Sequence, residues 1–556
     1  MGKFMLMPKL DMSMEEGVIV SWMVNKGDKV GKGDLVVEVE TGKVNLEVDN
    51  TAGKGVVLEF YAEPGDTIKV NEPIMYVGKE GEVPPPPPVS CGVSSKAPAT
   101  PSVDSGSYDW DLAVIGGGPG GYVCAIRSAQ LGAKVVLFEK EDIGGVCLNR
   151  GCIPTKTLVK NAELWKSIAN VEEFGITVSK PSFDWLKIQK RKAGVVSKLV
   201  GGVASLLKKN KVEVVKAYAE VASAHSISAN GKSFNVKNIV IAAGSVSAKV
   251  PVDVTDKTPV YSAEELLSIE ALPENLLVVG GGVIGLEMAS IFASFGVGTS
   301  IVELADDILP PADGEIRASL KKSLTDSGIN FYCGRTVKTV GNRKALLSDG
   351  TEVGCDAVLV AVGRTLPADF KPGIEILRGE RGWITVDEDL KTSVDSVYAI
   401  GDITGGIQLA HLASAQGVAV SEGLFGMKGK PINEDLVPSC IFTNPEAAWV
   451  GLTREEADRC GIPVKEGRFP FQASGKALAE GETGGFVKVL TDSRWDEVIG
   501  VHIVGANAVN LIAEAAAAMS FETTAEELAK IIHAHPTISE AIMEAAGDVA
   551  GMAVHI

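Results

Sequence analysis

The sequence predicts a multidomain α/β protein in which two doubly wound domains with parallel sheets follow a small all-β sandwich. Three observations support this fold class. A glycine turn of the form GxGxxG connects a predicted strand to a predicted helix twice, at 116–121 and 280–285. Residues 1–78 contain an internal repeat of short strands, and a proline-rich segment follows them. A chain of 556 residues has room for several hydrophobic cores.

Composition and charge argue against two classes of protein. The formal net charge is −18 and no cluster of Lys and Arg occurs, so we predict that the protein does not bind nucleic acid. No run of 18 apolar residues is present, so we predict no membrane span and expect a cytoplasmic protein. The eight cysteines of such a protein are not expected to form a disulfide framework. A close cysteine pair therefore indicates redox chemistry or metal binding.

Residues 1–78 repeat themselves at an offset of 38 residues, since GVIVSW at 17–22 matches GVVLEF at 55–60. Alternating apolar residues broken by Gly-Asp turns predict a sandwich with two related halves. In the segment EVETGKVNLEV at 38–48, two predicted strands flank a short turn. This pattern places Lys43 at the tip of a hairpin.

Residues 79–107 are expected to form a flexible linker. Five consecutive prolines stand at 84–88, and Ser, Gly and further prolines follow them. Such a composition cannot bury a hydrophobic core. Fully extended at about 3.1 Å per residue, the segment would span roughly 90 Å.

Both glycine turns are followed by an acidic residue 23 positions after the first glycine. The residues are Gly116, Gly118, Gly121 and Glu139 in the first copy and Gly280, Gly282, Gly285 and Glu303 in the second. The first glycine permits the turn, the second lets a pyrophosphate approach the backbone, and the third lets the helix pack on the strand. The acid can accept hydrogen bonds from a ribose. One such turn is also common as a plain structural feature, but two with the same offset indicate two dinucleotide sites.

The segment GGVCLNRGCIPTK at 144–156 places Cys147 and Cys152 close together, about 30 residues after the first glycine turn. A thiol pair beside a nucleotide site indicates a dithiol–disulfide cycle that exchanges electrons with a flavin and a nicotinamide. A zinc site is one alternative, but it needs four ligands and no second Cys or His pair at ligand spacing lies nearby. A second alternative is a pair of inert buried cysteines, but this alternative would not explain the adjoining glycines.

This segment resembles the active-site signature GGxCxNxGCIPTK of the flavin disulfide oxidoreductases, and residues 108–556 resemble the dihydrolipoamide dehydrogenases of that family. The resemblance implies that Cys147 is the interchange thiol and that Cys152 is the sulfur over the flavin. It also implies an ion pair beside the flavin N5 between Lys156 of the signature and Glu287 of GVIGLE.

Other segments resemble the FAD site of the same family. Asp402 in VYAIGDIT matches the aspartate that binds the ribitol-phosphate arm. Ala410 in QLAHLASAQG matches the helix at the N1 and O2 edge of the flavin. Gly244 in IAAGS and Gly363 are assigned to the cofactor sites by the same resemblance.

Oxidation of a substrate dithiol needs a base and a low-pKa interchange thiolate. In HAHPTISEAIMEA at 533–545, His535 and Glu540 match the family motif HPTxSE, in which the glutamate orients the imidazole. His533 either helps to shape the site or is a structural histidine. In this family the motif reaches the dithiol of the other subunit, so the resemblance implies a homodimer.

The residues after the second glycine turn favour NAD over NADP. Glu303 is followed by Leu304, Ala305 and two aspartates, whereas NADP-using glutathione reductases carry arginines there. Negative charge repels a 2′-phosphate. Mercuric reductases carry an extra cysteine pair at the C-terminus, but the last cysteine here is Cys460. We therefore expect FAD and NAD as cofactors, and no metal.

The N-terminal repeat resembles lipoyl domains, with ETGKV in place of their usual ETDKA. The resemblance makes Lys43 the expected attachment site of covalent lipoate. Biotin domains would show Met on both sides of the lysine, where this chain has Gly42 and Val44. An unmodified surface lysine is the remaining alternative.

The resemblance also gives an expected order of domains. They are a lipoyl domain at 1–78, the linker at 79–107, an FAD-binding domain at 108–257, an NAD-binding domain at 258–377, a central domain at 378–437 that completes the FAD site, and an α+β dimerisation domain at 438–556.

The expected activity is oxidation of protein-bound dihydrolipoyl groups through a disulfide between Cys147 and Cys152, with FAD and NAD. The expected partners are the lipoyl-bearing transacylase and the decarboxylase of a 2-oxo acid or acetoin dehydrogenase complex. One alternative is a reductase that runs from NADPH to a small disulfide. The other is a lipoyl carrier and scaffold without activity.

Overall fold

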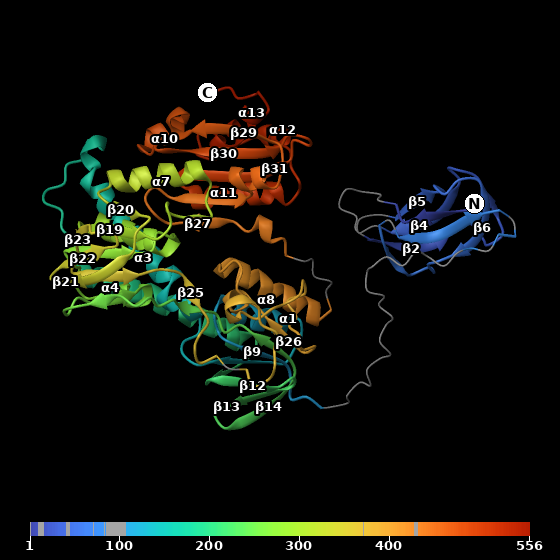
Figure 1. The fold of residues 1–556 in the computed structure, drawn as a ribbon, viewed down its shortest axis with the longest axis horizontal. Helices are drawn as coiled ribbons and strands as arrows, with labels where there is room; N and C mark the ends of the chain where they lie inside the picture. The colour runs from blue at the N-terminus through green and yellow to red at the C-terminus, as the bar shows by residue number, and fades with distance from the viewer. Residues whose placement is uncertain are drawn as a thin grey trace. The chain divides into compact units, whose positions relative to one another are not determined.

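The computed structural model describes residues 2–8, 16–40, 45–70, 72–79, 81–82, 84, 107–370, 372–426 and 432–556. The chain divides into two compact units, Met1–Gly106 and Ser107–Ile556 (Figure 1). Most of the predicted linker, from 85 to 106, lies outside the described residues.

The N-terminal unit is a sandwich of two four-stranded sheets. One sheet has the order β5 (Asn45–Asp49), β4 (Leu35–Glu40), β2 (Glu16–Trp22) and β7 (Thr67–Lys69), and the other has the order β1 (Lys3–Leu6), β8 (Pro73–Gly78), β6 (Gly55–Phe60) and β3 (Lys29–Val30). Strands β2, β3 and β4 lie 38 residues before β6, β7 and β8, so the sequence repeat builds two equivalent sheets. Fully buried Met5, Ile19, Val37 and Val57 contribute to the core between them.

The predicted hairpin near Lys43 is present as two paired strands. Strands β4 and β5 are antiparallel, with Glu40 opposite Asn45. The turn at 41–44, including Lys43 itself, lies outside the described residues.

The second unit begins with a largely parallel sheet. Its order is β11 (Glu213–Lys216), β10 (Val135–Glu139), β9 (Trp110–Ile115), β14 (Lys232–Ile241), β13 (Ser226–Ala229) and β12 (Ala219–Ser223), and β26 (Val397–Ala399) also pairs with β14. Strands β9, β10, β11, β14 and β26 pair in parallel, whereas β12, β13 and β14 form an antiparallel extension. The central strand β9 leads directly into the first glycine turn.

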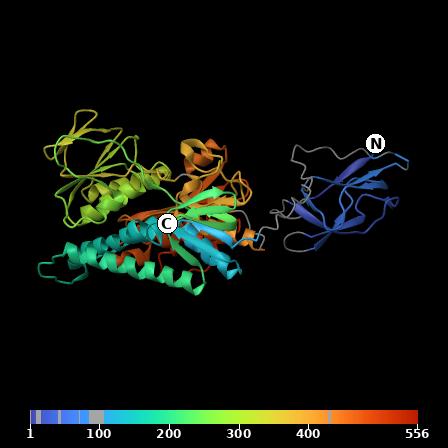
Figure 2. The ribbon, with the colours of Figure 1, turned by 90° about the horizontal axis from the view of Figure 1, so that it is seen from below.

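Helices from distant parts of the sequence pack around this sheet or lead from it to the other sheets of the unit. They are α1 (Pro119–Gln130), α2 (Gly145–Arg150), α3 (Cys152–Ala169), η1 (Val171–Phe174), α4 (Trp185–Lys209), η2 (Glu380–Gly382), η3 (Gly401–Thr404), α8 (Ala410–Leu424) and η4 (Glu434–Leu436). Figure 1 shows α8 in orange beside α1, and Figure 2 shows the long α3 and α4 in teal side by side. A Cβ at Gly417 would lie 2.6 Å from the Gly120 carbonyl oxygen, so glycine permits the close approach of α8 to α1.

A second parallel sheet with its own helices follows in the chain. Its order is β17 (Val260–Ser262), β24 (Ala357–Val360), β18 (Asn275–Val279), β19 (Gly298–Glu303) and β20 (Asn330–Cys333), and its helices are α5 (Ala263–Leu266), α6 (Val283–Ser294) and α7 (Gly314–Asp326). All four strand pairs are parallel. Smaller sheets join β16 (Asp253–Val254), β21 (Val337–Gly341), β22 (Lys344–Leu347) and β23 (Glu352–Gly354), and β15 (Val246–Ser247) with β25 (Arg364–Thr365). Strand β18 leads into the second glycine turn.

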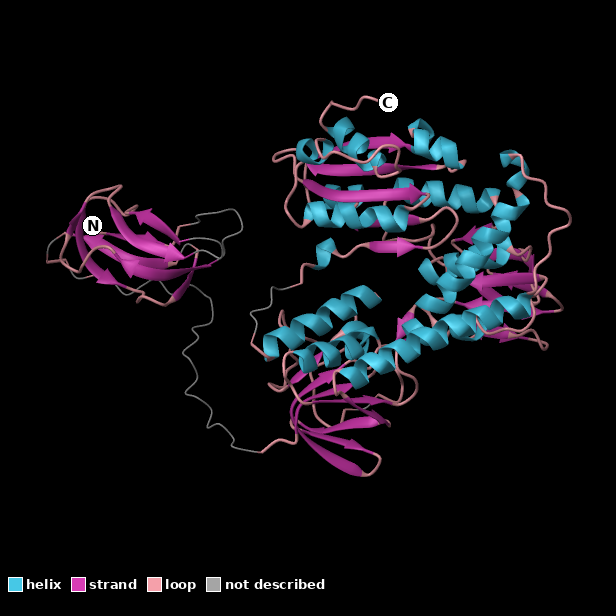
Figure 3. Ribbon diagram, turned by 180° about the vertical axis from the view of Figure 1, so that it is seen from behind, coloured by secondary structure: helices cyan, strands magenta, loops and turns pink. Residues whose placement is uncertain are grey.

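The C-terminal part is α+β. Its antiparallel sheet has the order β27 (Ser439–Ile441), β28 (Ala447–Gly451), β31 (Val498–Gly505), β30 (Gly485–Asp492) and β29 (Val464–Pro470). Its helices are α9 (Arg454–Arg459), η5 (Phe471–Ala473), α10 (Gly475–Glu480), α11 (Ala508–Met519), α12 (Ala525–Ala529) and α13 (Glu540–Val549). Helix α11 packs on β28 and β31, and α13 packs on β29 and β30 (Figure 3).

The predicted fold class is confirmed: an all-β sandwich precedes two parallel α/β sheets and an α+β C-terminal part. Within the part of the chain that the structure describes, no helix combines the length and the hydrophobicity that a bilayer crossing requires.

Candidate active site

The two glycine turns have nearly the same geometry. Gly116 and Gly280 have φ of 106° and 113°, a region that favours glycine. A Cβ at Gly116 would lie 2.2 Å from the Ala242 carbonyl oxygen, and one at Gly280 would lie 2.4 Å from that of Ala361. The first glycine of each turn is therefore required by the protein itself.

The third glycine of each turn is required for the same kind of reason. A Cβ at Gly121 would lie 1.8 Å from the Gly116 carbonyl oxygen, and one at Gly285 would lie 2.0 Å from that of Gly280. Each third glycine thus lets its helix, α1 or α6, pack against the strand that precedes the turn.

The second glycine of each turn faces free space. A Cβ at Gly118 would meet nothing nearer than the Gly145 Cα at 4.0 Å, and one at Gly282 would meet nothing within 4 Å. These glycines begin α1 and α6, whose first turns carry no acidic side chain and no side-chain cap. Free space in front of an uncapped helix N-terminus fits a dinucleotide pyrophosphate at each turn.

The two predicted ribose-binding acids make the same contacts. One oxygen of Glu139 accepts from the Gly117 amide at 2.7 Å, and one oxygen of Glu303 accepts from the Gly281 amide at 2.6 Å. Both acids are therefore held at the end of a strand beside a glycine turn. Of the aspartates after Glu303, Asp306 is exposed, while Asp307 pairs with the Lys321 ammonium at 2.9 Å. Part of the negative charge expected to repel a 2′-phosphate is therefore neutralised.

The dithiol lies at the junction of two helices. Cys147 is in α2, and Cys152 is the first residue of α3 after Gly151. A hydrogen bond between the two thiols raises the pKa of Cys147 and lowers the pKa of Cys152 to about 7, and Lys156 also favours the Cys152 thiolate.

This assignment differs from the expectation of a low-pKa interchange thiolate at Cys147. In a single chain the hydrogen bond lowers the pKa of Cys152 and raises that of Cys147. The reason is that Cys152 stands at a helix N-terminus and its thiolate accepts the hydrogen bond of Cys147, while burial opposes a charge on Cys147.

The predicted ion pair is present and partly buried. The Lys156 ammonium lies 3.0 Å from both oxygens of Glu287, whose side chain is only 5% exposed. The Phe442 amide donates to Glu287 at 3.0 Å, and the Phe442 ring lies 4.2 Å from the Lys156 nitrogen. The pair joins α3, which begins at the dithiol, to α6, which begins at the second glycine turn.

Asp402 belongs to a polar cluster beside β14 and β26. The Ser245 hydroxyl donates to Asp402, and the Arg364 guanidinium donates to the Ser245 hydroxyl at 2.6 Å. The neighbouring glycines, Gly244 and Gly363, have φ of 68° and 113° and free space where a Cβ would lie. This open edge fits an elongated phosphorylated cofactor arm. Ala410, the fourth predicted residue here, begins α8, whose first turn has no acidic residue and no side-chain cap.

His535 and Glu540 are brought together as predicted. The His535 Nδ1 lies 2.9 Å from a Glu540 oxygen, and the His535 side chain is 80% exposed. Burial opposes ionisation of Glu540, but hydrogen bonds from the Thr537 amide and from His535 hold the pKa of Glu540 below its usual range. The pair is therefore a charged carboxylate that orients an exposed imidazole.

The predicted dithiol and the predicted base are carried by elements that pack against different parts of the second unit. Helices α2 and α3 pack on one another and on α4 and α6, whereas α13 packs on α12, β29 and β30. His535 is therefore an exposed residue of the C-terminal part, held by Glu540 of α13.

Several residues that organise this region were not predicted from the sequence. Ser245 and Arg364 hold Asp402, Phe442 contacts both members of the ion pair, and Gln416 accepts from the Gly401 amide at 2.7 Å. Ser245 and Arg364 directly follow Gly244 and Gly363, so adjacency to those glycines was an available signal.

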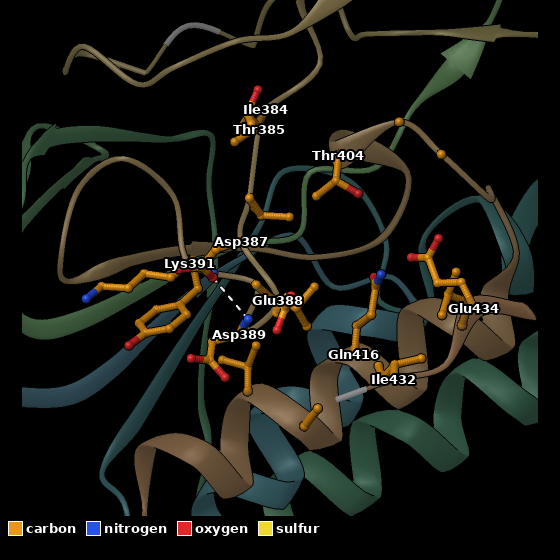
Figure 4. Close-up of a pocket in the computed structure, with 18 of the residues that line it drawn as sticks. Ile384, Thr385, Asp387, Glu388, Asp389, Lys391, Thr404, Gln416, Ile432 and Glu434 are labelled. Atoms are coloured by element: carbon orange, nitrogen blue, oxygen red, sulfur yellow. Dashed lines mark hydrogen bonds between the residues drawn. The ribbon is translucent and has the colours of Figure 1, made fainter. Parts of the chain in front are cut away.

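A cavity of about 890 Å³ lies beside α8, and none of the predicted site residues lines it. Figure 4 shows Asp387, Glu388, Asp389 and Glu434 around it, with Gln416 projecting from α8. Its described lining contains neither Cys nor His, so the thiol and base chemistry is located elsewhere.

Three family models match the chain. The pyridine nucleotide-disulphide oxidoreductase model matches residues 110–417, and the dimerisation domain of the same family matches residues 437–546. A model described as biotin-requiring enzyme matches residues 3–77.

Curated relatives and solved structures match most of the chain. The dihydrolipoyl dehydrogenase of Bacillus subtilis is 40% identical over 473 residues, which cover 80% of this chain and 99% of the relative. The mitochondrial dihydrolipoyl dehydrogenase of Pisum sativum is 39% identical, covering 81% and 94%.

Among solved structures, LpdA of Mycobacterium tuberculosis has a TM-score of 0.73 at 26% identity, covering 78% of this chain and 99% of that one. The HOCl-induced flavoprotein disulfide reductase RclA of Escherichia coli has a TM-score of 0.70 at 28% identity, covering 79% and 99%.

Proposed function

Since the chain belongs to the pyridine nucleotide-disulphide oxidoreductase family and resembles its dihydrolipoyl dehydrogenases, we propose that it oxidises dihydrolipoyl groups with NAD as acceptor. The family and the enzyme class predicted from the thiol signature are confirmed by these matches. The family uses FAD and NAD, in agreement with the expected cofactors.

The observation that carries the proposal is the position of the thiol pair. Cys152 begins the helix α3, and one turn later Lys156 binds Glu287 of α6. The thiol pair is therefore connected to both glycine turns, since α2 begins beside Gly118 and α3 is paired with α6. When bound, FAD supplies the two-electron carrier that connects the dithiol with NAD.

The thiol chemistry balances as an exchange of one disulfide for another. A thiolate of the dihydrolipoyl group attacks the Cys147 sulfur of the oxidised pair, and the bond to Cys152 breaks. Cys152 is the favoured leaving group because the charge of Lys156 stabilises the thiolate that departs. The second substrate thiol then attacks the mixed disulfide, which releases the lipoyl disulfide and leaves two electrons on the Cys147–Cys152 dithiol.

The partner subunit's His535 accepts the proton that the substrate thiol must lose. Its Nδ1 is held by Glu540, so Nε2 is the nitrogen available to the substrate. The exposure of His535 in one chain and the matched dimerisation domain support a site shared between two subunits.

A comparison of two assays tests the proposed function. We expect the purified flavoprotein to reduce NAD with dihydrolipoamide at a kcat/KM about 100-fold or more above that for NADPH oxidation by glutathione disulfide, because Glu303 and Asp306 disfavour a 2′-phosphate. A higher efficiency with NADPH and glutathione disulfide would favour the reductase alternative. A purified protein without bound flavin and without either activity would favour the carrier alternative.

We further propose that Lys43 carries lipoate and that the enzyme serves a 2-oxo acid or acetoin dehydrogenase complex, with a transacylase and a decarboxylase as partners, in the cytoplasm. The match of residues 3–77 and the pairing of β4 with β5 around the position of Lys43 support this. The intact mass of protein from a lipoate-supplied host should show one lipoyl group. Lys43→Arg should remove it, whereas Lys54→Arg, at an exposed lysine of the same unit, should not.

The role of the N-terminal unit can be separated from catalysis by truncation. A chain starting at Tyr108 should oxidise free dihydrolipoamide as well as the full chain, because the thiols, the base and both glycine turns lie beyond that residue. Within an assembled complex, tethering should make the full chain the faster electron acceptor. Equal rates in the complex would argue against a carrier role for Lys43.

A further inference from the structure

His533, two residues before the proposed base, is held in a very different way from His535. The side chain of His533 is 5% exposed, whereas that of His535 is 80% exposed. The Nδ1 of His533 lies 2.9 Å from the Ile531 carbonyl oxygen, and its Nε2 lies 2.5 Å from a Glu514 carboxyl oxygen. Both ring nitrogens are therefore engaged away from solvent.

The chemistry of these two contacts fixes where hydrogens must lie. A carbonyl oxygen only accepts, so Nδ1 of His533 must donate to Ile531. A short contact between Nε2 and an oxygen of Glu514 then requires one proton between them, on either the ring or the carboxyl group. The pair of His533 and Glu514 is thus linked by a short hydrogen bond.

One end of this link is anchored in the core of the C-terminal part. Glu514 is in α11, next to the buried residues Ile512 and Ala515, and α11 packs on β28 and β31. The other end is in the segment between α12 and α13. His533 therefore ties that segment to α11, a helix that precedes α12 in the chain.

The segment is anchored again on the far side of His535. The Thr537 amide donates to Glu540 at 2.8 Å, and the Thr537 hydroxyl donates to the Ala534 carbonyl oxygen at 2.7 Å. The positive charge of a protonated His533 also contributes to the lowered pKa of Glu540. His535 thus projects into solvent from a segment that is held at both ends.

We propose that His533 and Glu514 form a positioning pair that fixes the His535 segment for contact with the partner subunit's dithiol. The positioning itself follows from the contacts in this chain, and its consequence for catalysis rests on the proposed function. His533 touches no reacting atom in this scheme and acts through the segment that carries His535.

Hydrogen exchange of the segment tests the positioning in the full-length dimer. We expect His533→Ala and Glu514→Ala to speed amide exchange in peptides covering 531–540 by about 10-fold, since the segment loses one of its two anchors. Glu514→Gln should exchange like the wild type, because its amide N–H supplies the hydrogen that the Nε2 of a neutral imidazole accepts. Glu526→Ala, which removes an exposed pair with Lys530 in α12, is the matched control.

The activity of the same variants tests the catalytic consequence. We expect kcat for dihydrolipoamide oxidation to fall about 10-fold to 100-fold in Glu514→Ala, because a displaced base is costly. NADH oxidation by an artificial quinone, which needs no base at the thiols, should keep its rate, and Glu514→Gln should restore dihydrolipoamide oxidation.

Specific outcomes would overturn the positioning pair. Unchanged amide exchange at 531–540 in both His533→Ala and Glu514→Ala would contradict the proposal. Equal losses of dihydrolipoamide oxidation and of quinone-dependent NADH oxidation, in a variant that sediments as an intact dimer, would also contradict it. If His533→Ala does not fold, Glu514→Ala and Glu514→Gln decide the matter between them. If the wild type does not oxidise dihydrolipoamide, the proposed function fails, and the exchange measurement still decides whether the pair positions the segment.

Discussion

The two glycine turns of this protein are nearly identical locally and differ in what surrounds them. In both, the first and third glycines avoid backbone collisions and the acid at the strand end binds the turn. The first turn lies beside α2, with the Gly145 Cα at 4.0 Å from a Cβ at Gly118, and α8 packs on its helix. The second has no protein atom within 4 Å of a Cβ at Gly282.

This difference shows how one local motif serves two purposes. The turn itself only prepares a helix N-terminus for a pyrophosphate. The segments around each turn decide what lies next to that helix N-terminus, and at the first turn this is α2, which carries Cys147. Glu287, in the helix after the second turn, also pairs with Lys156 of α3. This ion pair connects the second turn with the helix that begins at Cys152.

The largest expected effect concerns the thiols, which follow only the first turn. Cys147→Ser and Cys152→Ser should each lower dihydrolipoamide oxidation by about 1,000-fold or more, because the exchange step loses a sulfur. NADH oxidation by an artificial quinone should persist. Cys460→Ser, at an exposed cysteine, is the control and should be fully active. Substantial dihydrolipoamide oxidation by either thiol variant would remove the dithiol from the mechanism.

The next effect separates the turns by the same substitution. Gly118→Ala should lower the FAD content of the folded protein by about 10-fold or more, whereas Gly282→Ala should keep FAD and raise the KM for NAD by a similar factor, because each methyl group enters the space for a pyrophosphate. Flavin absorbance, circular dichroism and steady-state kinetics measure these quantities.

Two results of the glycine experiment would contradict the comparison. Loss of folding in Gly118→Ala would show that protein contacts, rather than a cofactor, require that glycine. Loss of FAD in Gly282→Ala would show that the second turn does not serve NAD.

A smaller effect tests the charge on the thiols. Since the pKa of Cys152 is lowered to about 7, its alkylation in the reduced protein should rise with pH up to about 8 and level off above that value. Cys147→Ala removes the hydrogen bond that is the main cause of the lowered pKa of Cys152. The pKa of Cys152 should therefore rise, and alkylation at pH 7 should slow about 10-fold for each pH unit by which it rises. Cys147→Ser keeps a hydroxyl donor and should resemble the wild type. The same alkylation profile in all three proteins would exclude the hydrogen bond as the cause.

The smallest effect compares the two acids. Glu303→Arg should raise the efficiency with NADP relative to NAD by about 5-fold to 10-fold, since it replaces a ribose acceptor with a partner for a 2′-phosphate. The change is modest because exposed Asp306 remains. Glu139→Arg, the equivalent change at the first turn, should affect FAD retention without changing the ratio of the two nicotinamide cofactors. An unchanged ratio in Glu303→Arg would remove Glu303 from the choice of cofactor.

The local features of the protein could be predicted from the sequence alone. The glycine spacing, the acid at 23 residues, the thiol pair and the His535–Glu540 pair each depend on residues close together in the chain. Backbone geometry within a turn or helix brings the nearest of these residues together, and the parallel pairing of consecutive strands brings Glu139 and Glu303 to their turns, so a pattern of residue types is sufficient to find them. The 38-residue repeat likewise predicted a sandwich with two related halves, although the structure places β7 of the second half in the sheet of β2 and β4, and β3 of the first half in the sheet of β6 and β8.

Only the tertiary structure decided the contacts between distant segments. Ser245, Arg364 and Asp402 meet because β14, β25 and η3 converge, and no periodicity marks that meeting. The pKa values of the two thiols also depend on packing, because desolvation and nearby charges shift them. The contact of His533 with Glu514 likewise forms only when α11 and the segment before α13 pack together. Motifs therefore locate the reacting groups, whereas tertiary packing determines the environment of each group.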